Sequence, residues 1–410
     1  MQSFLFRYPV MKRTIRVILV TFLILFLGLS QLTPSWESLL YRMDDQSERQ
    51  YSFEERFAET VSDLKAQWMN LSGEDPEAEV QIPETEIPLS GAAERETETA
   101  SVENAVANLA DSVTVRSDFL TENDFLSMDY GSFWLESWSY INYGLKSVYH
   151  LNYYDISPEQ LSVMKSQVDA EIQDIIASVP RDATTWEAMK VVHDELCRRV
   201  SYDRSKSRTH CHDCYGALVE HSAVCTGYAS AYCLILERLG IPCELVSSDT
   251  HCWNVVRIPS HECFVDVTWD DTDRKDNQGA EYIRYDYFFL SKEEMNQVEE
   301  HNLVDIPSDG LPSGNMSYNY FTVYDYRIPS YDTNRIVKTL RRQIRAKKNT
   351  LSVRFERAED YQRALQWFEH DSHELFKLLH AAGLRTRGSC VSWLNNDDLL
   401  TINILLRYPG

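Results

Sequence analysis

Hydrophobic and polar positions repeat with helical spacing in the middle of the chain. The apolar residues Trp186, Met189 and Val192 recur every third residue, which places them on one face of a helix. Thr184 precedes them and Glu187 follows three residues after it, which is the arrangement of a capping box. The pattern therefore predicts a helix that begins just after Thr184.

Neighbouring stretches predict further elements. Residues 138–154 are rich in Tyr, Ile and Val around Asn142-Tyr143-Gly144, which indicates a β-hairpin. Ser157 followed by a proline predicts the start of a helix that runs to about Ser178. From about residue 317 the pattern indicates a separate small α+β unit. Its predicted strands are Phe321–Tyr326, Leu351–Phe355 and Leu400–Leu406, and its predicted helices are Thr333–Ala346, Ala358–Phe368 and Ser372–Ala382.

One predicted helix begins at a cysteine. After Cys225, apolar residues such as Ala229 and Leu236 recur at helical spacing, and Gly240 followed by Pro242 ends the pattern. The N-terminus of a helix carries free N–H groups and the positive end of the macrodipole, which favour a thiolate. Most cysteines are structural and buried, so the position of Cys225 alone leaves both a structural and a nucleophilic role open.

Two strand-like segments follow, HCWNVVRI and CFVDVTW. A two-residue turn at Pro259-Ser260 places Trp253 opposite Asp266 and His251 opposite Thr268. His251 and Asp266 then lie diagonally on one face of the pair, within reach of a hydrogen bond. A carboxylate that fixes a histidine in this way prepares it to act as the base for a cysteine. The alternative is a packed histidine beside an unrelated aspartate.

Length, net charge and cysteine count limit the number of domains, the class of partner and the disulfide pairing of the chain. The chain has 410 residues, enough for two or three domains, and its net charge of −23 argues against nucleic acid as the main partner. Nine cysteines are an odd number, so at least one thiol lacks a partner within the chain.

The N-terminus carries a basic segment followed by the apolar run VILVTFLILFLGL. This run predicts an uncleaved membrane anchor or a signal peptide, and the positive-inside rule sends the rest of the chain out of the cytoplasm. Ten acidic residues and three prolines between Gly73 and Asn104 indicate a disordered spacer. The predicted layout is 1–16 basic segment, 17–32 anchor or signal peptide, 33–72 stalk, 73–116 acidic disordered linker, 117–316 catalytic domain and 317–410 small α+β domain.

The segments AVCTGYASAY, HCWNVV and FVDVTWDD together resemble the transglutaminase-like superfamily, particularly its bacterial transglutaminase/protease-like members. The resemblance covers about residues 117–295. It implies a papain-like α+β fold, in which the helix with the cysteine packs on an antiparallel sheet that carries the histidine and aspartate. Because these residues occupy the matching positions of the family's motif, the resemblance implies a role for each. Cys225 is then the nucleophile, His251 the general base and acid, and Asp266 the residue that orients His251.

The resemblance implies acyl transfer through a thioester on amide bonds, with no metal or other cofactor. Hydrolysis by an extracytoplasmic, membrane-anchored or secreted protease or amidase is the main hypothesis, and peptide or protein, in some cases cell-wall associated, is the expected substrate. A protein cross-linking transglutaminase is the second hypothesis. A non-catalytic surface binding module with the same fold is the third. An intact set of cysteine, histidine and aspartate argues against the third.

Two other features suggest alternative chemistry. The run His210-Cys211-His212-Asp213-Cys214 offers metal-binding or redox side chains, but no second ligand pair completes a zinc pattern. A local disulfide, a metal site and plain loop residues all remain open. A basic stretch from Arg335 to Lys348 predicts either a solvated helix face or contact with an anionic polymer or membrane headgroups.

Overall fold

The computed structural model describes most of the chain from residue 92 onwards. The described residues are 92–116, 120, 122–143, 146–258, 261–276, 279–301, 317–370, 373–381 and 391–407. Within them, no helix combines the length and the apolar character needed to cross a membrane. The predicted anchor or signal peptide at 17–32 and the stalk at 33–72 lie outside the described residues.

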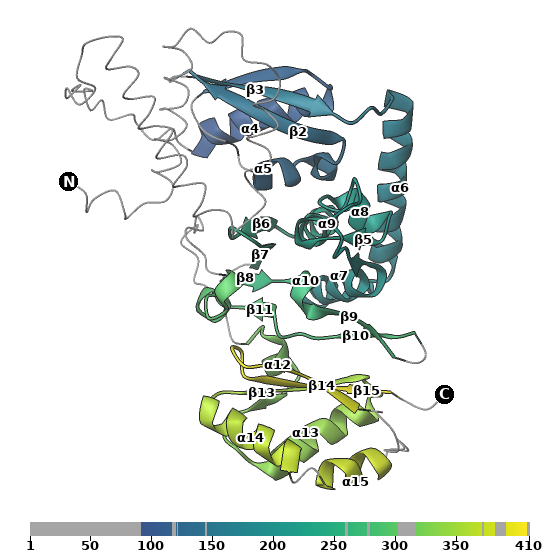
Figure 1. The fold of residues 1–410 in the computed structure, drawn as a ribbon, viewed down its shortest axis with the longest axis vertical. Helices are drawn as coiled ribbons and strands as arrows, with labels where there is room; N and C mark the ends of the chain where they lie inside the picture. The colour runs from purple at the N-terminus through teal and green to yellow at the C-terminus, as the bar shows by residue number, and fades with distance from the viewer. Residues whose placement is uncertain are drawn as a thin grey trace, which may run out of the picture. The chain divides into compact units, whose positions relative to one another are not determined.

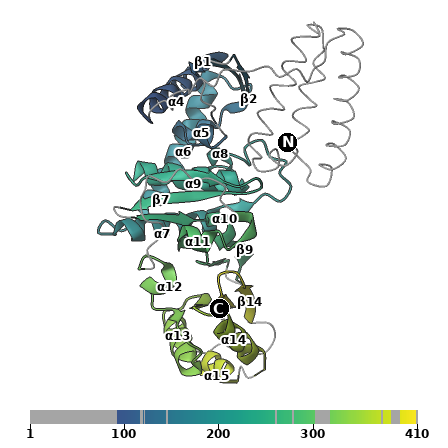
Figure 2. The same ribbon diagram turned by 90° about the vertical axis from the view of Figure 1, so that its left-hand side faces the viewer.

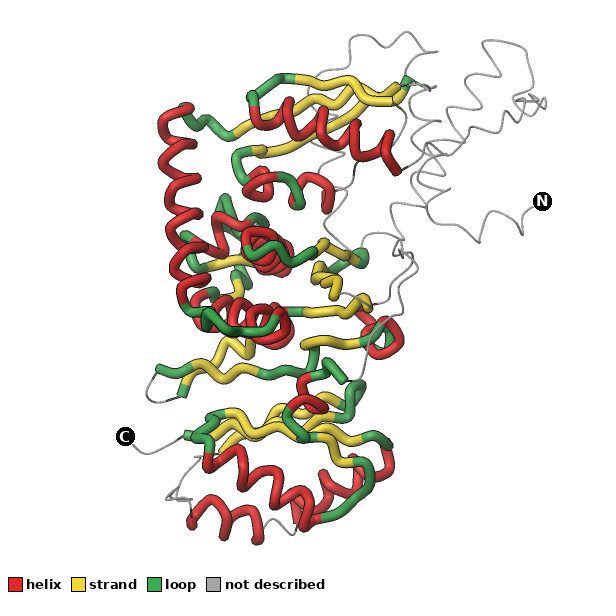
Figure 3. Tube along the Cα trace, turned by 180° about the vertical axis from the view of Figure 1, so that it is seen from behind, coloured by secondary structure: helices red, strands yellow, loops and turns green. Residues whose placement is uncertain are grey.

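The first described elements form a helix and a three-stranded sheet. Helix α4 (Ala92–Ala107) lies along β1 (Ser112–Arg116), β3 (Lys146–Tyr153) and β2 (Leu135–Asn142), which pair in that order (Figure 3). The predicted β-hairpin is therefore confirmed as β2 and β3. The predicted disordered linker is wrong for residues 92–116.

The reason for that error is an apolar helix face within an acidic segment. Val102 and Val106 are almost fully buried in the core, and the backbone oxygen of Val106 accepts a hydrogen bond of 3.1 Å from the Trp134 indole. The apolar residues bury enough surface on this side to offset the entropy cost of ordering the segment.

Two capped helices follow the sheet. Helix α6 (Pro158–Ala177) and helix α7 (Thr185–Arg199) each begin with a capping box, at Ser157 and Thr184, and the box at Thr184 was predicted. In each box the hydroxyl accepts from the backbone N–H three residues later, while that residue's side chain returns to the cap N–H. Both predicted helix starts are confirmed.

Helix α9 packs on an antiparallel sheet at the centre of the core, and Figure 2 shows it next to β7. The sheet order is β11-β8-β7-β6. The bounds are α9 Cys225–Arg238, β6 Cys243–Ser247, β7 Cys252–Ile258, β8 His261–Val265 and β11 Phe288–Leu290. The predicted α+β class, with the cysteine-bearing helix on an antiparallel sheet, is confirmed.

Short elements connect these layers. They are α5 Glu122–Leu126, η1 Asp129–Ser132, β4 Ser201–Tyr202, α8 Cys214–Leu218, β5 Ser222–Ala223, α10 Val267–Asp270, β9 Asp271–Lys275, β10 Glu281–Ile283, α11 Lys292–Met295, η2 Glu299–His301 and α12 Tyr320–Val323. The predicted strand at Phe321–Tyr326 is wrong, because α12 occupies its first part. Its aromatic residues pack into the core of the preceding domain.

The C-terminal domain consequently begins near residue 327 rather than 317, since Ile328 is the first residue of its own hydrophobic cluster. Its helices lie on one side of a four-stranded sheet (Figure 1). The bounds are β12 Arg327–Ile328, α13 Thr333–Arg345, β13 Thr350–Phe355, α14 Ala358–His370, α15 His373–Ala381, β14 Val391–Asn396 and β15 Thr401–Leu406. Apart from the Phe321–Tyr326 strand, each predicted strand or helix of this unit has a counterpart here.

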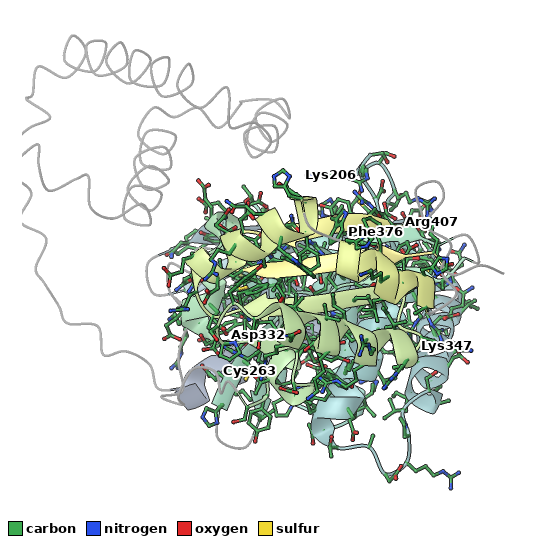
Figure 4. The ribbon with its side chains drawn as sticks, turned by 90° about the horizontal axis from the view of Figure 1, so that it is seen from below. Lys206, Cys263, Asp332, Lys347, Phe376 and Arg407 are labelled. Carbon is green, nitrogen blue, oxygen red and sulfur yellow. The ribbon has the colours of Figure 1, made fainter. Side chains whose placement is uncertain are left out.

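The basic helix of the C-terminal domain is partly neutralised by the chain itself. Figure 4 labels Asp332, which caps α13, and Lys347, which follows it. Arg335 and Arg342 each place a guanidinium nitrogen 3.1 Å from a carboxylate oxygen of Asp325. The structure thus accounts for part of the basic stretch by internal pairs, and contact with an anionic polymer stays a prediction.

Buried polar contacts join the C-terminal sheet to the core. The Asn403 amide nitrogen on β15 lies 2.9 Å from a carboxylate oxygen of the fully buried Asp286. Arg354 on β13 donates at 2.8 Å to Glu294 of α11. Hydrogen bonds to buried charged groups of this kind are costly to break, so the two domains are not independent of one another at this contact.

Candidate active site

Cys225 is the first residue of α9. The preceding residue, Val224, is extended and provides no side-chain cap, so the first N–H groups of the helix have no side-chain acceptor from the cap. The Cys225 side chain lies at the edge of the core, with the residue about 9% exposed. Its predicted position at a helix N-terminus is confirmed. The site can therefore offer both a thiol and N–H donors to one carbonyl group.

A glycine allows this helix start to pack closely on the preceding loop. A Cβ added at Gly227 would lie 2.7 Å from the Ala223 Cβ and 2.9 Å from the Asp213 carbonyl oxygen. Such distances are too short for any other residue, so Gly227 fixes how the first turn of α9 sits against the segment before it. The position of Cys225 depends on this close approach.

The strand pair places His251 and Asp266 as its parity predicts. Asn254 is opposite Val265 and Ile258 is opposite His261, which is the register that the prediction requires. His251 immediately precedes β7 and Asp266 immediately follows β8. The His251 Nε2 atom lies 2.7 Å from Asp266 Oδ2. The predicted strand register and the contact between His251 and Asp266 are therefore confirmed.

The predicted pairing of His251 with Thr268 is wrong. The strand ladder stops at Val265, and Thr268 lies within α10. Asp266 caps this short helix by accepting a 3.0 Å hydrogen bond from the Trp269 N–H at Oδ1. The change from strand to helix turns the backbone away and leaves Oδ2 of Asp266 directed at His251.

Burial and charge act in opposite directions on this pair. Burial alone would lower the pKa of His251, but the charge and hydrogen bond of Asp266, together with the Cys225 thiol within hydrogen-bonding reach, raise it to about 10. Burial would raise the pKa of Asp266, yet His251 and a second histidine hold it well below its usual range. The arrangement favours an imidazolium beside the sulfur at neutral pH.

The second histidine is His301, which the sequence did not reveal. It is fully buried in η2, and its Nε2 atom lies 2.7 Å from the same Asp266 Oδ2 atom that His251 contacts. His301 follows Asp266 by 35 positions and belongs to no periodic segment. Only the tertiary packing brings it here.

Ligand atoms of His251, Asp266 and His301 lie within 4.8 Å of one another, and this is the only such group of three among the described residues. The set has the chemistry to hold a divalent ion. The loop residues Cys211 and Cys214 are not part of it.

The loop at 210–214 has a structural arrangement instead. Asp213 caps α8 and accepts from His210 at 2.8 Å. Cys214 donates to the Tyr130 carbonyl, and neither Cys211 nor Cys214 forms a disulfide. Of the alternatives left open by the sequence, these contacts favour loop residues that hold α8 in place.

His193 is fully buried on α7. Its ring nitrogens contact Asp194 at 3.1 Å and Asp270 at 3.2 Å. Asp270 also accepts from the Tyr287 N–H at 3.0 Å. These contacts link α7, α10 and the strand region after it, and none of them involves Cys225.

Residues 172–285 match the family model described as the transglutaminase-like superfamily. Solved structures with local similarity include a TGase, with 11% identity and a TM-score of 0.25 over 40% of this chain and 53% of that one. Menin, in a structure with its binding site for Mixed Lineage Leukemia protein, has 23% identity and a TM-score of 0.23 over 32% and 30%.

A third structure is described as a "Putative Cysteine Protease from Cytophaga hutchinsonii", with 11% identity and a TM-score of 0.22 over 32% of this chain and 61% of that one. The matched region spans less than two thirds of each of the three structures. A search of curated proteins gave no match.

Proposed function

Residues 172–285 belong to the transglutaminase-like superfamily, and we propose on this basis that the chain is a cysteine enzyme that attacks amide bonds and hydrolyses them. The contact that carries the proposal is the 2.7 Å hydrogen bond between His251 and Asp266, with the Cys225 thiol within hydrogen-bonding reach of the same ring. Nucleophile, base and orienting acid are the three roles that acyl transfer by a cysteine requires.

The reaction follows from these positions. The Cys225 thiolate adds to the amide carbonyl carbon, and the negative charge that develops on the oxygen is stabilised by N–H groups at the start of α9. His251 gives its proton to the leaving nitrogen as the C–N bond breaks, which leaves a thioester on Cys225. Water then attacks the thioester while His251 accepts its proton, and the acid and the thiolate are released.

We place the reaction outside the cytoplasm, on peptide or protein. The apolar run at 17–32 with basic residues before it supports this location, and the net charge of −23 argues against a nucleic-acid substrate.

A binding module is the weaker alternative. Asp266 is completely buried, and burying a charged carboxylate is costly unless a function or a fold requires it.

Turnover on peptide mixtures tests the proposal. The full chain and its Cys225→Ser variant are incubated with casein peptides, with and without a primary amine such as cadaverine, and products are identified by mass spectrometry. New termini that depend on Cys225 support hydrolysis. Cadaverine attached to glutamine, with ammonia released, would replace hydrolysis by cross-linking. Equal product from wild type and Cys225→Ser would contradict the cysteine mechanism.

A further inference from the structure

The surroundings of His301 differ from those of an ordinary core histidine. Its ring is enclosed by the rings of Trp253 and Trp269, each with a centroid 4.8 Å away, and Tyr287 stacks on it at 5.4 Å with an interplanar angle of 17°. The residue is 0% exposed. Inside this aromatic cage Asp266 is its hydrogen-bond partner.

The two ring nitrogens of His301 have different environments. Nε2 is 2.7 Å from Asp266 Oδ2, whereas Nδ1 is buried and has no hydrogen-bond partner in the part of the chain that the structure describes. A proton on Nδ1 would be a buried donor without an acceptor, which is costly. The neutral tautomer with its proton on Nε2 avoids this, so His301 donates to Asp266.

We propose that His301 is a positioning residue of the active site, which fixes the Asp266 carboxylate with a second N–H so that Asp266 holds His251 toward Cys225. The inference rests on the proposed function, because it assigns His301 a role in that same reaction. Asp266 is then held at three points: Trp269 N–H at Oδ1, and the rings of His251 and His301 at Oδ2. Removing His301 leaves the carboxylate free to tilt about its remaining contacts.

The C-terminal domain contributes to this support. The Asn396 amide at the end of β14 donates at 2.8 Å to the hydroxyl of Tyr287, the ring that stacks on His301. Leu399, in the turn between β14 and β15, packs in the same buried cluster as Tyr287 and Trp253. A role for the C-terminal domain follows from this placement: it closes the aromatic cage behind the catalytic carboxylate.

A metal ion is the competing explanation for two histidines on one aspartate. Both imidazoles approach the same oxygen at hydrogen-bonding distance, and the other oxygen is occupied by the Trp269 N–H. An ion would have to displace these hydrogen bonds inside a cage walled by aromatic rings. The geometry therefore favours the hydrogen-bonded arrangement, and the metal content of the protein tests it.

The test uses alkylation of Cys225, which needs no knowledge of the substrate. The rate of iodoacetamide modification is followed by peptide mass spectrometry between pH 5 and 9 for wild type, His301→Leu and His301→Gln, all as full chains. His301→Leu removes the donor, whereas His301→Gln retains an N–H that can reach Asp266. His193→Leu is the matched control, because it removes another fully buried histidine that contacts aspartate away from Cys225.

We expect the pH midpoint of Cys225 alkylation to rise by about one unit in His301→Leu, which is a tenfold slower reaction on the acid side. His301→Gln should recover most of the wild-type rate, and His193→Leu should leave the midpoint unchanged. Thermal unfolding of each variant, monitored by circular dichroism, shows that the comparison is made on folded protein.

Identical midpoints in wild type, His301→Leu and His301→Gln would overturn the inference and leave the proposed function standing. The same midpoint shift in His193→Leu would also overturn it, because the effect would then belong to any buried histidine. One equivalent of tightly bound zinc in the wild type that is lost from His301→Leu would replace the positioning role by a metal site. A wild-type Cys225 that reacts like the same cysteine in the unfolded chain would instead remove the proposed function.

Discussion

Asp266 and Asp270 frame the same short helix, and both are completely buried against histidine rings. Their pKa values nevertheless move in opposite directions. Burial raises the pKa of Asp270 to about 6, although His193 acts against it and the neighbouring Asp286 adds to it. His251 and His301 hold the pKa of Asp266 well below its usual range despite equal burial.

The difference lies in the partners rather than in burial. Asp266 receives two imidazole N–H groups on one oxygen and a backbone N–H on the other. Asp270 shares its one histidine, His193, with Asp194. A buried carboxylate stays charged only where enough donors replace the lost water. Of the two carboxylates, only Asp266 therefore keeps its negative charge into the acidic range beside the histidine that faces Cys225.

The largest expected effect comes from Asp266→Asn. The amide carries no charge to stabilise the His251 imidazolium, so we expect kcat/KM to fall by at least about a hundredfold and Cys225 alkylation at pH 6 to slow in parallel. Asp270→Asn is the matched control, since it changes the other end of α10. Comparable losses from both substitutions would show that helix integrity, rather than the Asp266 charge, sets the activity.

Asp270 and Asp266 should make the unfolding free energy of the protein depend on pH with opposite signs. Asp270 has a folded pKa near 6, above its unfolded value, so wild type should lose stability relative to Asp270→Asn as pH rises from about 4 to 6. The full loss is on the order of 3 kcal/mol. Urea unfolding of both proteins across this range measures it, and a difference independent of pH would refute the shifted titration.

For Asp266 the lowered pKa gives stability that is present above about pH 4 and lost in stronger acid. His251, with a pKa raised to about 10, adds stability that is complete below about pH 6.5 and lost as pH rises toward 10. The unfolding free energy of wild type relative to Asp266→Asn should therefore be largest between about pH 4 and 6.5. A difference that keeps growing up to pH 9 would contradict the paired titration.

The smallest expected effect comes from the C-terminal contact. Asn396→Ala removes the buried hydrogen bond to Tyr287 and should cost about 1 kcal/mol of unfolding free energy. Because the aromatic ring stays in place, Cys225 alkylation should slow by no more than about twofold, or about 0.4 kcal/mol. A loss of reactivity as large as that of Asp266→Asn would mean that the C-terminal domain holds the site more directly than these contacts imply.

The parts of this site that the sequence predicted are those encoded locally. Strand parity across a two-residue turn was enough to place His251 and Asp266 on one face, and the apolar spacing after Cys225 was enough to place it at a helix start. His301 could not be found in this way, because a 3-10 turn far along the chain has no repeating pattern. Its role depends on rings contributed by three separate segments.

The dependence on tertiary packing also explains the errors in the predicted fold. The acidic composition of 92–107 indicated disorder, although Val102 and Val106 recur at the spacing of one helix face. Aromatic residues near 320 suggested a strand, but they form a helical turn because they fill the core of the domain before them. Composition and local pattern do not show which surface will be available to pack against.

The most direct test of the account is the rate at which iodoacetamide modifies Cys225 in the folded wild-type chain at pH 6. A thiolate paired with the His251 imidazolium predicts a rate at least about tenfold above that of the same cysteine in the urea-unfolded chain. A rate in the folded protein equal to or below the unfolded one would contradict the central claim that Cys225, His251 and Asp266 form a working nucleophile.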